Sequence, residues 1–334
     1  MLIRGKSSVF LGGFAITLAG AILFSTKAIF VKQAFRDTGT DVLSLLAVRM
    51  LFALPFYLAA AFYFSRQKEN VRFTGRQWVL IILLGILGYY LSSLFDFIGL
   101  QYISAGLERL ILFLYPTFTV LLNMLLFRQP VTRRQGLALA LIYGGAVIAY
   151  LGELNISGFG RDIVTGSLWI LLCAMTFAMY LIGSGRMIKQ VGDKKFTAYA
   201  MLAATAGVLL HSLAVNGEQL IIIKPGLIWY GLLLAVVATV LPSFMIANGL
   251  KRIGSNNVSI ISAVGPVSTI LQAHWFLGEP IFAGQLAGTA LVIGGILLIG
   301  WKAGSGEGKE IGSKGENNSG AESEKRNKTE NKPN

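Results

Sequence analysis

The stretch GLERLILFLYP, residues 106–116, places the opposite charges of Glu108 and Arg109 in sequence that is otherwise apolar. The mostly apolar sequence continues beyond Pro116, and the next charged residue is Arg128. A membrane-spanning helix needs about 20 predominantly apolar residues. The segment therefore predicts a membrane span that carries two charges and a proline near its centre.

The composition of the whole chain agrees with such a span. Of its 334 residues, 54% are hydrophobic and only 13% are charged, and the mean hydropathy is +0.65. Soluble domains carry about 25% charged residues, so we expect an all-α membrane protein. We place ten spans, at residues 9–31, 42–64, 78–99, 103–127, 135–152, 165–189, 197–215, 226–250, 255–278 and 281–302.

The charged and metal-binding residues exclude several other classes of protein. The net charge is +13, but Lys and Arg lie in short clusters between apolar runs, which is typical of membrane orientation and not of a nucleic-acid partner. One cysteine and two histidines are too few for a zinc or Cys/His catalytic site. The chain also has no GxxxxGK[ST] loop for ATP. We therefore expect no cofactor, no metal and no enzymatic activity.

The distribution of Lys and Arg predicts the orientation. If the N-terminus is cytoplasmic, fifteen of these residues flank spans on the inside and four, Lys32, Arg36, Arg161 and Lys224, on the outside. Loops rich in Lys and Arg stay in the cytoplasm, so we expect both termini inside, in the inner (cytoplasmic) membrane. Residues 303–334 contain one isoleucine and no aromatic residue, which predicts a disordered cytoplasmic tail.

An internal repeat appears when residues 99–151 are shifted by 150 positions. No gap is needed, and the matched residues include Pro116 with Pro266, Thr119 with Thr269, and Gly144–Gly145 with Gly294–Gly295. Each copy contains five spans, so the second copy would enter the membrane in the opposite direction. The sequence thus predicts two inverted five-helix repeats, residues 1–152 and 165–302, as in secondary transporters whose substrate site lies near the midplane.

Polar side chains recur at helical spacing in the third, fourth, eighth and ninth spans. Spacings of three, four and seven residues place each set along one helix face. A single hydroxyl can instead bond to a carbonyl of its own helix, but four such faces together predict a polar cavity. The candidate cavity residues are Lys27, Arg49, Tyr89, Ser92, Asp96, Tyr115, Pro116, Thr119, Thr239, Ser243, Ser262, Pro266 and Thr269.

Charged residues inside spans are functional hypotheses by default, because each costs about 2.5–3.5 kcal/mol on insertion scales. We expect Glu108 to pair with Lys27 or Arg49, and Arg109 with Asp96. Such pairs could serve only insertion and register, or they could form an outer gate. Three cations outnumber two acids, so the cluster could also anchor a substrate carboxylate. The candidate gate or proton-coupling residues are Asp96, Glu108, Arg109 and His274.

Several segments resemble the EamA family of the drug/metabolite transporter superfamily. They are GAILFSTKAIFVK (20–32), LLAVRM (45–50), GLQYISAGLERLILFLYPTFTVLL (99–122), LPSFMIANGLKRIGSNNVSIISAVGPVSTIL (241–271) and FLGEP (276–280). The resemblance covers about residues 10–302 and implies ten helices in two inverted repeats, with a cavity lined by helices 1, 3, 4, 6, 8 and 9. The first copy has Gln129 where the second has Glu279, so the acidic residue typical of that turn is missing from the first.

The sequence thus predicts a secondary transporter of small metabolites, such as amino acids or related zwitterionic or anionic compounds. The resemblance implies that transport is often export, and the repeat implies alternating access around the cavity. The expected partners are a small-molecule substrate, the lipid bilayer and, as a candidate coupling ion, protons. Two other classes stay open: a sensor or scaffold that does not transport, and a membrane-embedded enzyme. The oligomeric state stays open as well.

Overall fold

Helix α1 (Leu2–Thr38) begins the fold in this computed structural model, which describes residues 2–66, 72–127, 133–157, 160–217, 225–262 and 264–300. The helix ends at Gly39, whose φ of 58° is a conformation that favours glycine. Asp41 then caps α2 (Val42–Ser65), because its carboxylate accepts a hydrogen bond from Ser44 N at 2.9 Å. Two long apolar helices therefore follow one another through a tight turn.

All later elements are also helical, and the described ranges contain no β-strand, so the all-α prediction is confirmed. Three of the elements are short π-helical turns, η1, η3 and η4. In chain order the elements are α3 (Gly75–Gly85), η1 (Ile86–Leu91), α4 (Ser92–Gly99), α5 (Ala105–Leu112), α6 (Tyr115–Phe127), α7 (Arg133–Ser157), α8 (Arg161–Val191), α9 (Asp193–Asn216), α10 (Pro225–Ala235), η3 (Val236–Val240), α11 (Leu241–Ser262), α12 (Gly265–Gln272), η4 (Ala273–Leu277) and α13 (Ala283–Gly300).

Eight helical segments of the described chain are long and apolar enough to cross a membrane, and Ala283–Leu298 forms a shorter apolar helix. The eight segments coincide with the first eight predicted spans. The ninth prediction, 255–278, does not reappear as one helix, because its first part belongs to α11 and its second part to α12 and η4. The predicted tail, 303–334, lies outside the described residues.

The predicted connection between the eighth and ninth spans is wrong in position, because residues 251–254 are helical within α11. The first half differs at the matching place. There Ser104 accepts a hydrogen bond from Leu107 N at 3.1 Å and caps α5 as a separate helix. Its counterpart 150 residues later is Gly254, which has no side chain for such a cap. The second half therefore continues as helix through this point.

Both central prolines lie at the beginning of a helix. The predicted span 103–127 is divided into α5 and α6, with a turn at Phe113 and Leu114. Pro116 occupies the second position of α6, and Pro266 occupies the first turn of α12 just after Val264. Proline lacks the N–H that would bond to the preceding turn, so each span is broken shortly before its proline.

The boundaries of the helices repeat at an interval of 150 residues. The elements η1 and α6 begin at residues 86 and 115, and η3 and α12 begin at residues 236 and 265. The π-helical turns η1 and η3 form one of these pairs. The sequence repeat is therefore accompanied by a repeat of local structure, including its irregular turns.

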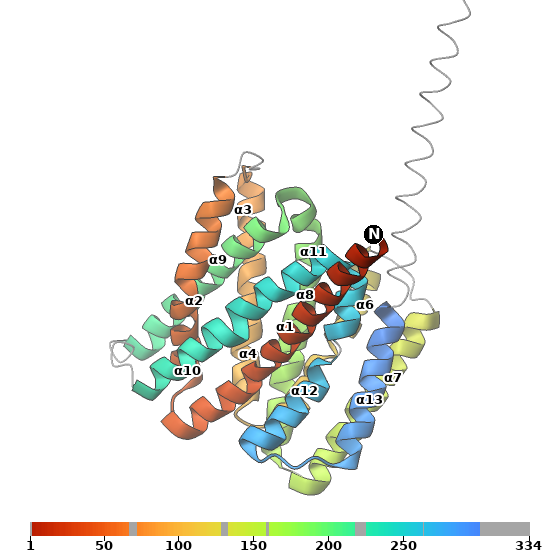
Figure 1. The fold of residues 1–334 in the computed structure, drawn as a ribbon. Helices are drawn as coiled ribbons and strands as arrows, with labels where there is room; N and C mark the ends of the chain where they lie inside the picture. Colours follow the sequence, from red (N-terminus) through yellow and green to blue (C-terminus); the bar gives the residue numbers. More distant parts are fainter. Residues whose placement is uncertain are drawn as a thin grey trace, which may run out of the picture.

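Close packing between the halves depends on glycine. Helices α7 and α13 lie side by side (Figure 1), and a Cβ on Gly145 would come within 2.5 Å of Gly288 O. A Cβ on Gly288 would likewise come within 2.4 Å of Gly145 O. In the same interface, a Cβ on Gly295 would lie 2.7 Å from Ala138 O. Small residues let helix backbones approach in this way inside membranes.

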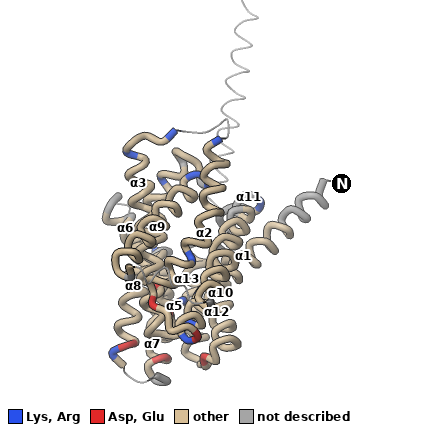
Figure 2. The backbone as a smooth tube through the Cα atoms, turned by 90° about the vertical axis from the view of Figure 1, so that its left-hand side faces the viewer, with Lys and Arg blue, Asp and Glu red and all other residues tan. Residues whose placement is uncertain are grey.

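The two ends of the helical bundle differ in charge. Figure 2 shows that most of the colour at one end of the described chain marks Lys and Arg, whereas Asp and Glu are seen mainly in the middle and toward the opposite end. Arg66 and Arg76 lie around the connection between α2 and α3, whereas Asp37 and Glu279 lie at the α1–α2 and η4–α13 connections at the opposite end of the bundle (Figure 1). This asymmetry is the one that orients helical membrane proteins.

Candidate functional site

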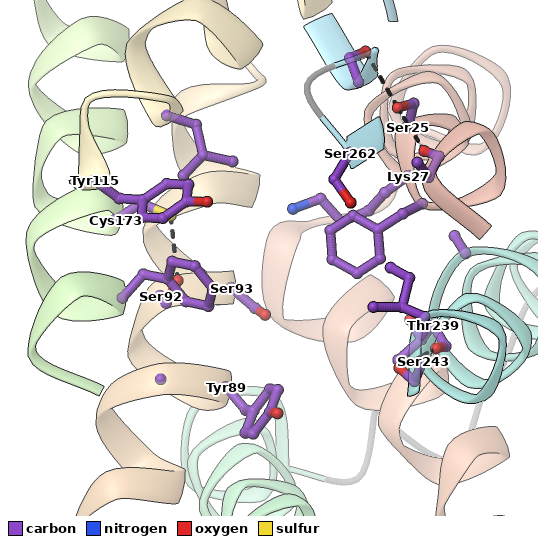
Figure 3. A pocket seen from close by; sticks show the side chains of 18 of the residues that line it. Ser25, Lys27, Tyr89, Ser92, Ser93, Tyr115, Cys173, Thr239, Ser243 and Ser262 are labelled. Carbon is purple, nitrogen blue, oxygen red and sulfur yellow. Dashed lines mark hydrogen bonds between the residues drawn. The ribbon is translucent and has the colours of Figure 1, made fainter. Parts of the chain in front are cut away.

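A cavity of about 260 Å³ lies inside the bundle, between the two halves of the chain. Its walls come from α1, α2, η1, α4, α5 and α6 on one side of the sequence and from α8, α9, η3, α11 and α12 on the other. Figure 3 shows Tyr89, Ser92 and Tyr115 across the cavity from Thr239 and Ser243. Both repeats therefore contribute to one interior space.

Many lining residues are related by the 150-residue shift. Tyr89 and Thr239 both line the cavity, and they occupy matching places in η1 and η3. Five further matched pairs that line it are Lys27 with Phe177, Gly88 with Ala238, Ser93 with Ser243, Leu112 with Ser262, and Tyr115 with Gly265. The cavity thus lies where equivalent segments of the two halves face each other. π-Helical turns frequently occur at functional sites, and here η1 and η3 each contribute two lining residues.

Lys27 forms an ion pair with Asp96 at the cavity wall. The Nζ and Oδ2 atoms are 2.7 Å apart, and Asp96 is completely buried behind Lys27. The predicted pairing of Asp96 with Arg109 is therefore wrong. Helix α4 carries Asp96 toward α1, whereas Arg109 points from α5 toward α12, and its Nε donates a hydrogen bond to Thr269 Oγ1 at 3.1 Å.

Glu108 lies next to Arg109 and not next to Lys27 or Arg49, so that predicted pairing is also wrong. Arg109 Nε is 3.9 Å from Glu108 Oε2, and both side chains are buried. Neighbouring positions on a helix point about 100° apart, but the long Arg109 side chain spans that angle. Arg109 also lines the cavity, so one guanidinium connects Glu108, Thr269 and the interior space.

Arg49 is the cation that keeps no acidic partner. It is 5% exposed, and no carboxylate lies within 4.0 Å of it in the part of the chain that the structure describes. Its Nη1 is 3.4 Å from Ser93 Oγ, and its guanidinium lies 5.5 Å from the centre of the Phe97 ring. Burying an unpaired cation is costly. Because Arg49 lines the cavity, a ligand with a negative group can supply the missing partner.

Seven further predicted residues also line the cavity, and they supply mainly hydroxyl groups: Lys27, Tyr89, Ser92, Tyr115, Thr239, Ser243 and Ser262. Some of these hydroxyls already have partners. Ser243 Oγ donates to Thr239 O at 2.6 Å, and Tyr89 Oη is 2.8 Å from Tyr180 Oη. Ser92 Oγ is 3.3 Å from Cys173 Sγ. The hydroxyl wall is thus held in place by bonds to its own scaffold.

The other predicted residues lie behind the cavity wall or away from it. Pro116 and Pro266 begin helices, and Thr119 Oγ1 donates to Tyr115 O at 2.9 Å. Asp96, Glu108 and Thr269 are buried against the cations described above. His274 is exposed, and its Nδ1 is 2.9 Å from Glu279 O. The sequence pattern therefore selected these residues, but their side chains do not line the cavity.

The sequence predicted Tyr115 as a cavity residue but not its aromatic neighbours in the wall. Phe113, Tyr115 and Phe177 form a chain of ring contacts with centroids 6.0 and 5.2 Å apart, and Tyr57 lines the same cavity. Phe177 lies 150 residues after Lys27, but both residues are outside the region 99–151 and its shifted copy, so the sequence repeat did not mark Phe177. Tyr57 also has no signal, since it lies in an apolar run of α2.

The cavity has the chemistry of a binding site for a small organic molecule. It combines one unpaired guanidinium, several hydroxyls and an aromatic wall, and no cluster of three metal-ligating side chains occurs in the described ranges. With several apolar spans around this space, the fold and site define a multi-pass helical membrane protein with an internal cavity whose mainly apolar wall carries a few polar groups.

The sequence profile of the EamA-like transporter family matches residues 11–151 and again residues 164–301. The chain therefore belongs to this family of membrane transporters. It is 31% identical over 291 residues to "Uncharacterized transporter YcbK" of Bacillus subtilis, covering 86% of this chain and 91% of that protein.

Two further similarities concern a named transporter and a solved structure. An S-adenosylmethionine/S-adenosylhomocysteine transporter of Chlamydia trachomatis serovar L2 is 24% identical over 243 residues, which is 70% of this chain and 73% of that protein. One solved crystal structure has a TM-score of 0.59 at 21% identity and covers 88% of this chain and 96% of its own. This last likeness concerns the fold alone.

Proposed function

We propose that the chain is a secondary transporter that moves small metabolites with an acidic group across the cytoplasmic membrane. The observation that carries this proposal is Arg49, a buried guanidinium without an acidic partner among the described residues, in a cavity lined by both halves of the chain. A substrate carboxylate would pair with Arg49, and hydrogen bonds to charged groups are stronger than neutral ones. The hydroxyl and aromatic walls would hold the rest of the substrate.

The proposed mechanism is alternating access between two inverted five-helix repeats, residues 1–152 and 165–302. Ten spans follow if α10, η3 and the first part of α11 form the eighth pass, the rest of α11 with α12 and η4 forms the ninth, and α13 forms the tenth. Support comes from the lining pairs that are 150 residues apart, because a site between inverted repeats is formed by equivalent segments of both. Rocking of one repeat against the other would expose this site to each face of the membrane in turn.

The proposed orientation has both termini in the cytoplasm, with export as the direction of transport. The end of the bundle that is richer in Lys and Arg would face the cytoplasm. Residues 303–334 would then form a cytoplasmic tail. Export agrees with the direction that the family resemblance implies.

An α-amino acid is a suitable class of substrate for this cavity. S-adenosylmethionine and S-adenosylhomocysteine, after which the Chlamydia trachomatis relative is named, both carry a carboxylate and an amine. Arg49 would bind the carboxylate of such a molecule. Protons are the proposed coupling ion, with Glu108 as the carrier, because its carboxylate is fully buried beside a cavity-lining arginine.

The test is a thermal-shift screen of the purified protein against amino acids and related carboxylic acids. A ligand that binds only the folded state raises its apparent stability. Hits are then tested by counterflow in liposomes. Arg49→Gln is expected to weaken binding of the hit about 10- to 100-fold, which corresponds to a lost charged hydrogen bond.

The matched control is Arg161→Gln, since Arg161 is an exposed arginine at the start of α8 and does not line the cavity. Binding by this variant should equal that of the unchanged chain. A carboxylate ligand that binds equally well to the Arg49→Gln variant would contradict the proposed role of Arg49.

A further inference from the structure

The two halves of the chain are joined at a second place, around Glu279. This residue lies in the connection between η4 and α13, in the second half. Its carboxylate accepts hydrogen bonds from Ala105 N at 3.0 and 3.1 Å and from Gly106 N at 3.4 Å, at the beginning of α5 in the first half. A carboxylate at a helix N-terminus is favoured both by the free N–H groups and by the helix dipole.

Lys32 of α1 strengthens this junction. Its Nζ lies 3.4 Å from Glu279 Oε1 and donates to Ile103 O at 2.7 Å. The backbone of Glu279 is fixed in turn, because Glu279 O is 2.9 Å from His274 Nδ1. We call the contacts of Glu279 with Lys32, Ala105 and Gly106 the Glu279 clasp. The clasp ties α1, α5 and the η4–α13 connection together.

The fit around Gly106 shows how closely the halves approach here. A Cβ at residue 106 would collide with Nε2 of Gln285, so the end of the Gln285 side chain of α13 lies directly against the α5 backbone. Gln285, Lys32 and Glu279 also line a second cavity of about 290 Å³. This cavity lies at the acidic end of the bundle, beyond the buried charges of α5.

Helix α5 connects the clasp with the candidate substrate cavity. It contains only residues Ala105–Leu112 and is separated from α4 and α6 by turns on both sides. Glu279 holds its first residues, and Arg109, one turn further along, lines the substrate cavity. A movement of the N-terminus of α5 would therefore move Arg109 and its bond to Thr269 as well.

The sequence provides such an acid at only one of the two equivalent turns. The counterpart of Glu279 in the first repeat is Gln129, which carries no charge. A neutral amide makes weaker hydrogen bonds to backbone N–H groups than a carboxylate does, and it forms no ion pair with a lysine. The charged clasp therefore favours closure at one end of the bundle and not at the other.

We propose that Glu279 is a positioning residue that locks the Lys32 end of the transporter closed by holding α5 in place. The lock rests on the proposed function, because closure at one end has a role only in a protein that works by alternating access. Opening at this end breaks the contacts of Glu279 with Ala105, Gly106 and Lys32, and α5 then moves with Arg109. Without the lock, the conformation that is open at the Lys32 end becomes more populated.

The test uses the full chain in sealed membrane vesicles of both orientations, with its one cysteine as the reporter. Cys173 lines the substrate cavity, so a membrane-impermeant methanethiosulfonate reaches it only from an open side. Glu279→Gln is expected to increase labelling from the Lys32 face about tenfold, because a charged hydrogen-bond network is lost. Labelling from the other face should decrease.

Asp162→Asn is the control, because Asp162 is an exposed carboxylate in the first turn of α8 that lines neither cavity and takes no part in the clasp. Its labelling should match that of the unchanged chain. Hydrogen exchange at Ala105 N and Gly106 N gives a second readout on purified protein, and Glu279→Gln should speed it about tenfold. The melting temperature of both variants is measured to verify that they fold. Labelling of the denatured chain verifies that the Cys173 thiol can react.

Two results would overturn the lock: labelling from the Lys32 face that is no faster in Glu279→Gln than in Asp162→Asn, or exchange at Ala105 and Gly106 that is unchanged. These readouts need no substrate. The labelling and the exchange could change as expected while none of the acids binds in the thermal-shift screen. That outcome would refute the proposed substrate class and leave the lock supported.

Discussion

Arg49 and Lys27 show at the residue scale how two buried cations in one cavity can have different roles. Lys27 is neutralised by Asp96 at 2.7 Å, so its charge is used within the protein. Arg49 has only Ser93 Oγ and the Phe97 ring as described neighbours for its guanidinium. The sequence could count three cations against two acids, but it could not tell which cation would be left over. Which cation stays unpaired depends on the directions in which Asp96 of α4 and Glu108 of α5 point.

The Lys27–Asp96 pair is expected to be a structural requirement. Asp96→Asn leaves Lys27 buried without its partner, and breaking a buried ion pair in this way costs about 3–5 kcal/mol. The variant should therefore unfold at a clearly lower temperature than the unchanged chain. Combining Lys27→Met with Asp96→Asn removes both charges and should recover most of that loss. A single Asp96→Asn variant as stable as the unchanged chain would show that the pair does not stabilise the fold.

Glu108 is expected to control the pH dependence of transport. If Glu108 must take up a proton in each cycle, transport by the unchanged chain falls as the pH rises and the carboxyl loses its proton. Glu108→Gln is neutral at every pH, so its counterflow rate should stay level across the same range. The comparison is made with a substrate found in the thermal-shift screen. Equal pH profiles for the two chains would leave Glu108 with a purely structural role.

Prolines and glycines determine the shape of the elements. Pro116 and Pro266 break their spans because they cannot donate a backbone hydrogen bond, and α6 and α12 begin 150 residues apart for this reason. The sequence predicts where such breaks occur. It does not predict the π-helical turns η1 and η3, because no residue type specifies an extra residue in a helical turn. The repeat nevertheless shows that Tyr89 and Thr239 occupy equivalent positions.

The packing of α7 against α13 provides a test with a built-in control. Gly145→Ala places a Cβ within 2.5 Å of Gly288 O, so the helices must move apart, at a cost of about 1–3 kcal/mol. Gly144→Ala changes the adjacent residue, and its Cβ would meet nothing within 4 Å. Thermal unfolding in detergent should show a lower melting temperature for the first variant alone. Equal melting temperatures would mean that the glycine contact does not limit the packing.

At the scale of the whole molecule, apolar run length was sufficient to locate most of the spans. Segments of about 18 or more apolar residues have one stable solution in lipid, which is a helix with all its backbone groups bonded. The rule did not give the correct helix for the region 255–278. This region is interrupted around Val264, and its first part belongs to α11. Polar residues in this region line the cavity or bond to cations of the first half. The length of the apolar run alone therefore does not describe the region.

The candidate site depends on long-range packing, and this limits what the sequence predicts. Helical spacing placed Tyr115 and Ser262 on inward faces, and the structure brings both to the cavity. Thr269 lies on a similar face but is used by Arg109. Glu279 has no polar neighbours in sequence that mark it, and its role follows only from the meeting of the two halves.

The central claim is that the cavity lies between two halves of opposite orientation, and the topology of two loops tests it most directly. Val131→Cys and Pro280→Cys are made separately in a chain with Cys173→Ser, and intact cells are treated with a membrane-impermeant maleimide. The account predicts that the cysteine at position 280 is labelled in intact cells, whereas the cysteine at position 131 is labelled only after the membrane is permeabilised. Labelling of both positions under the same condition would contradict it.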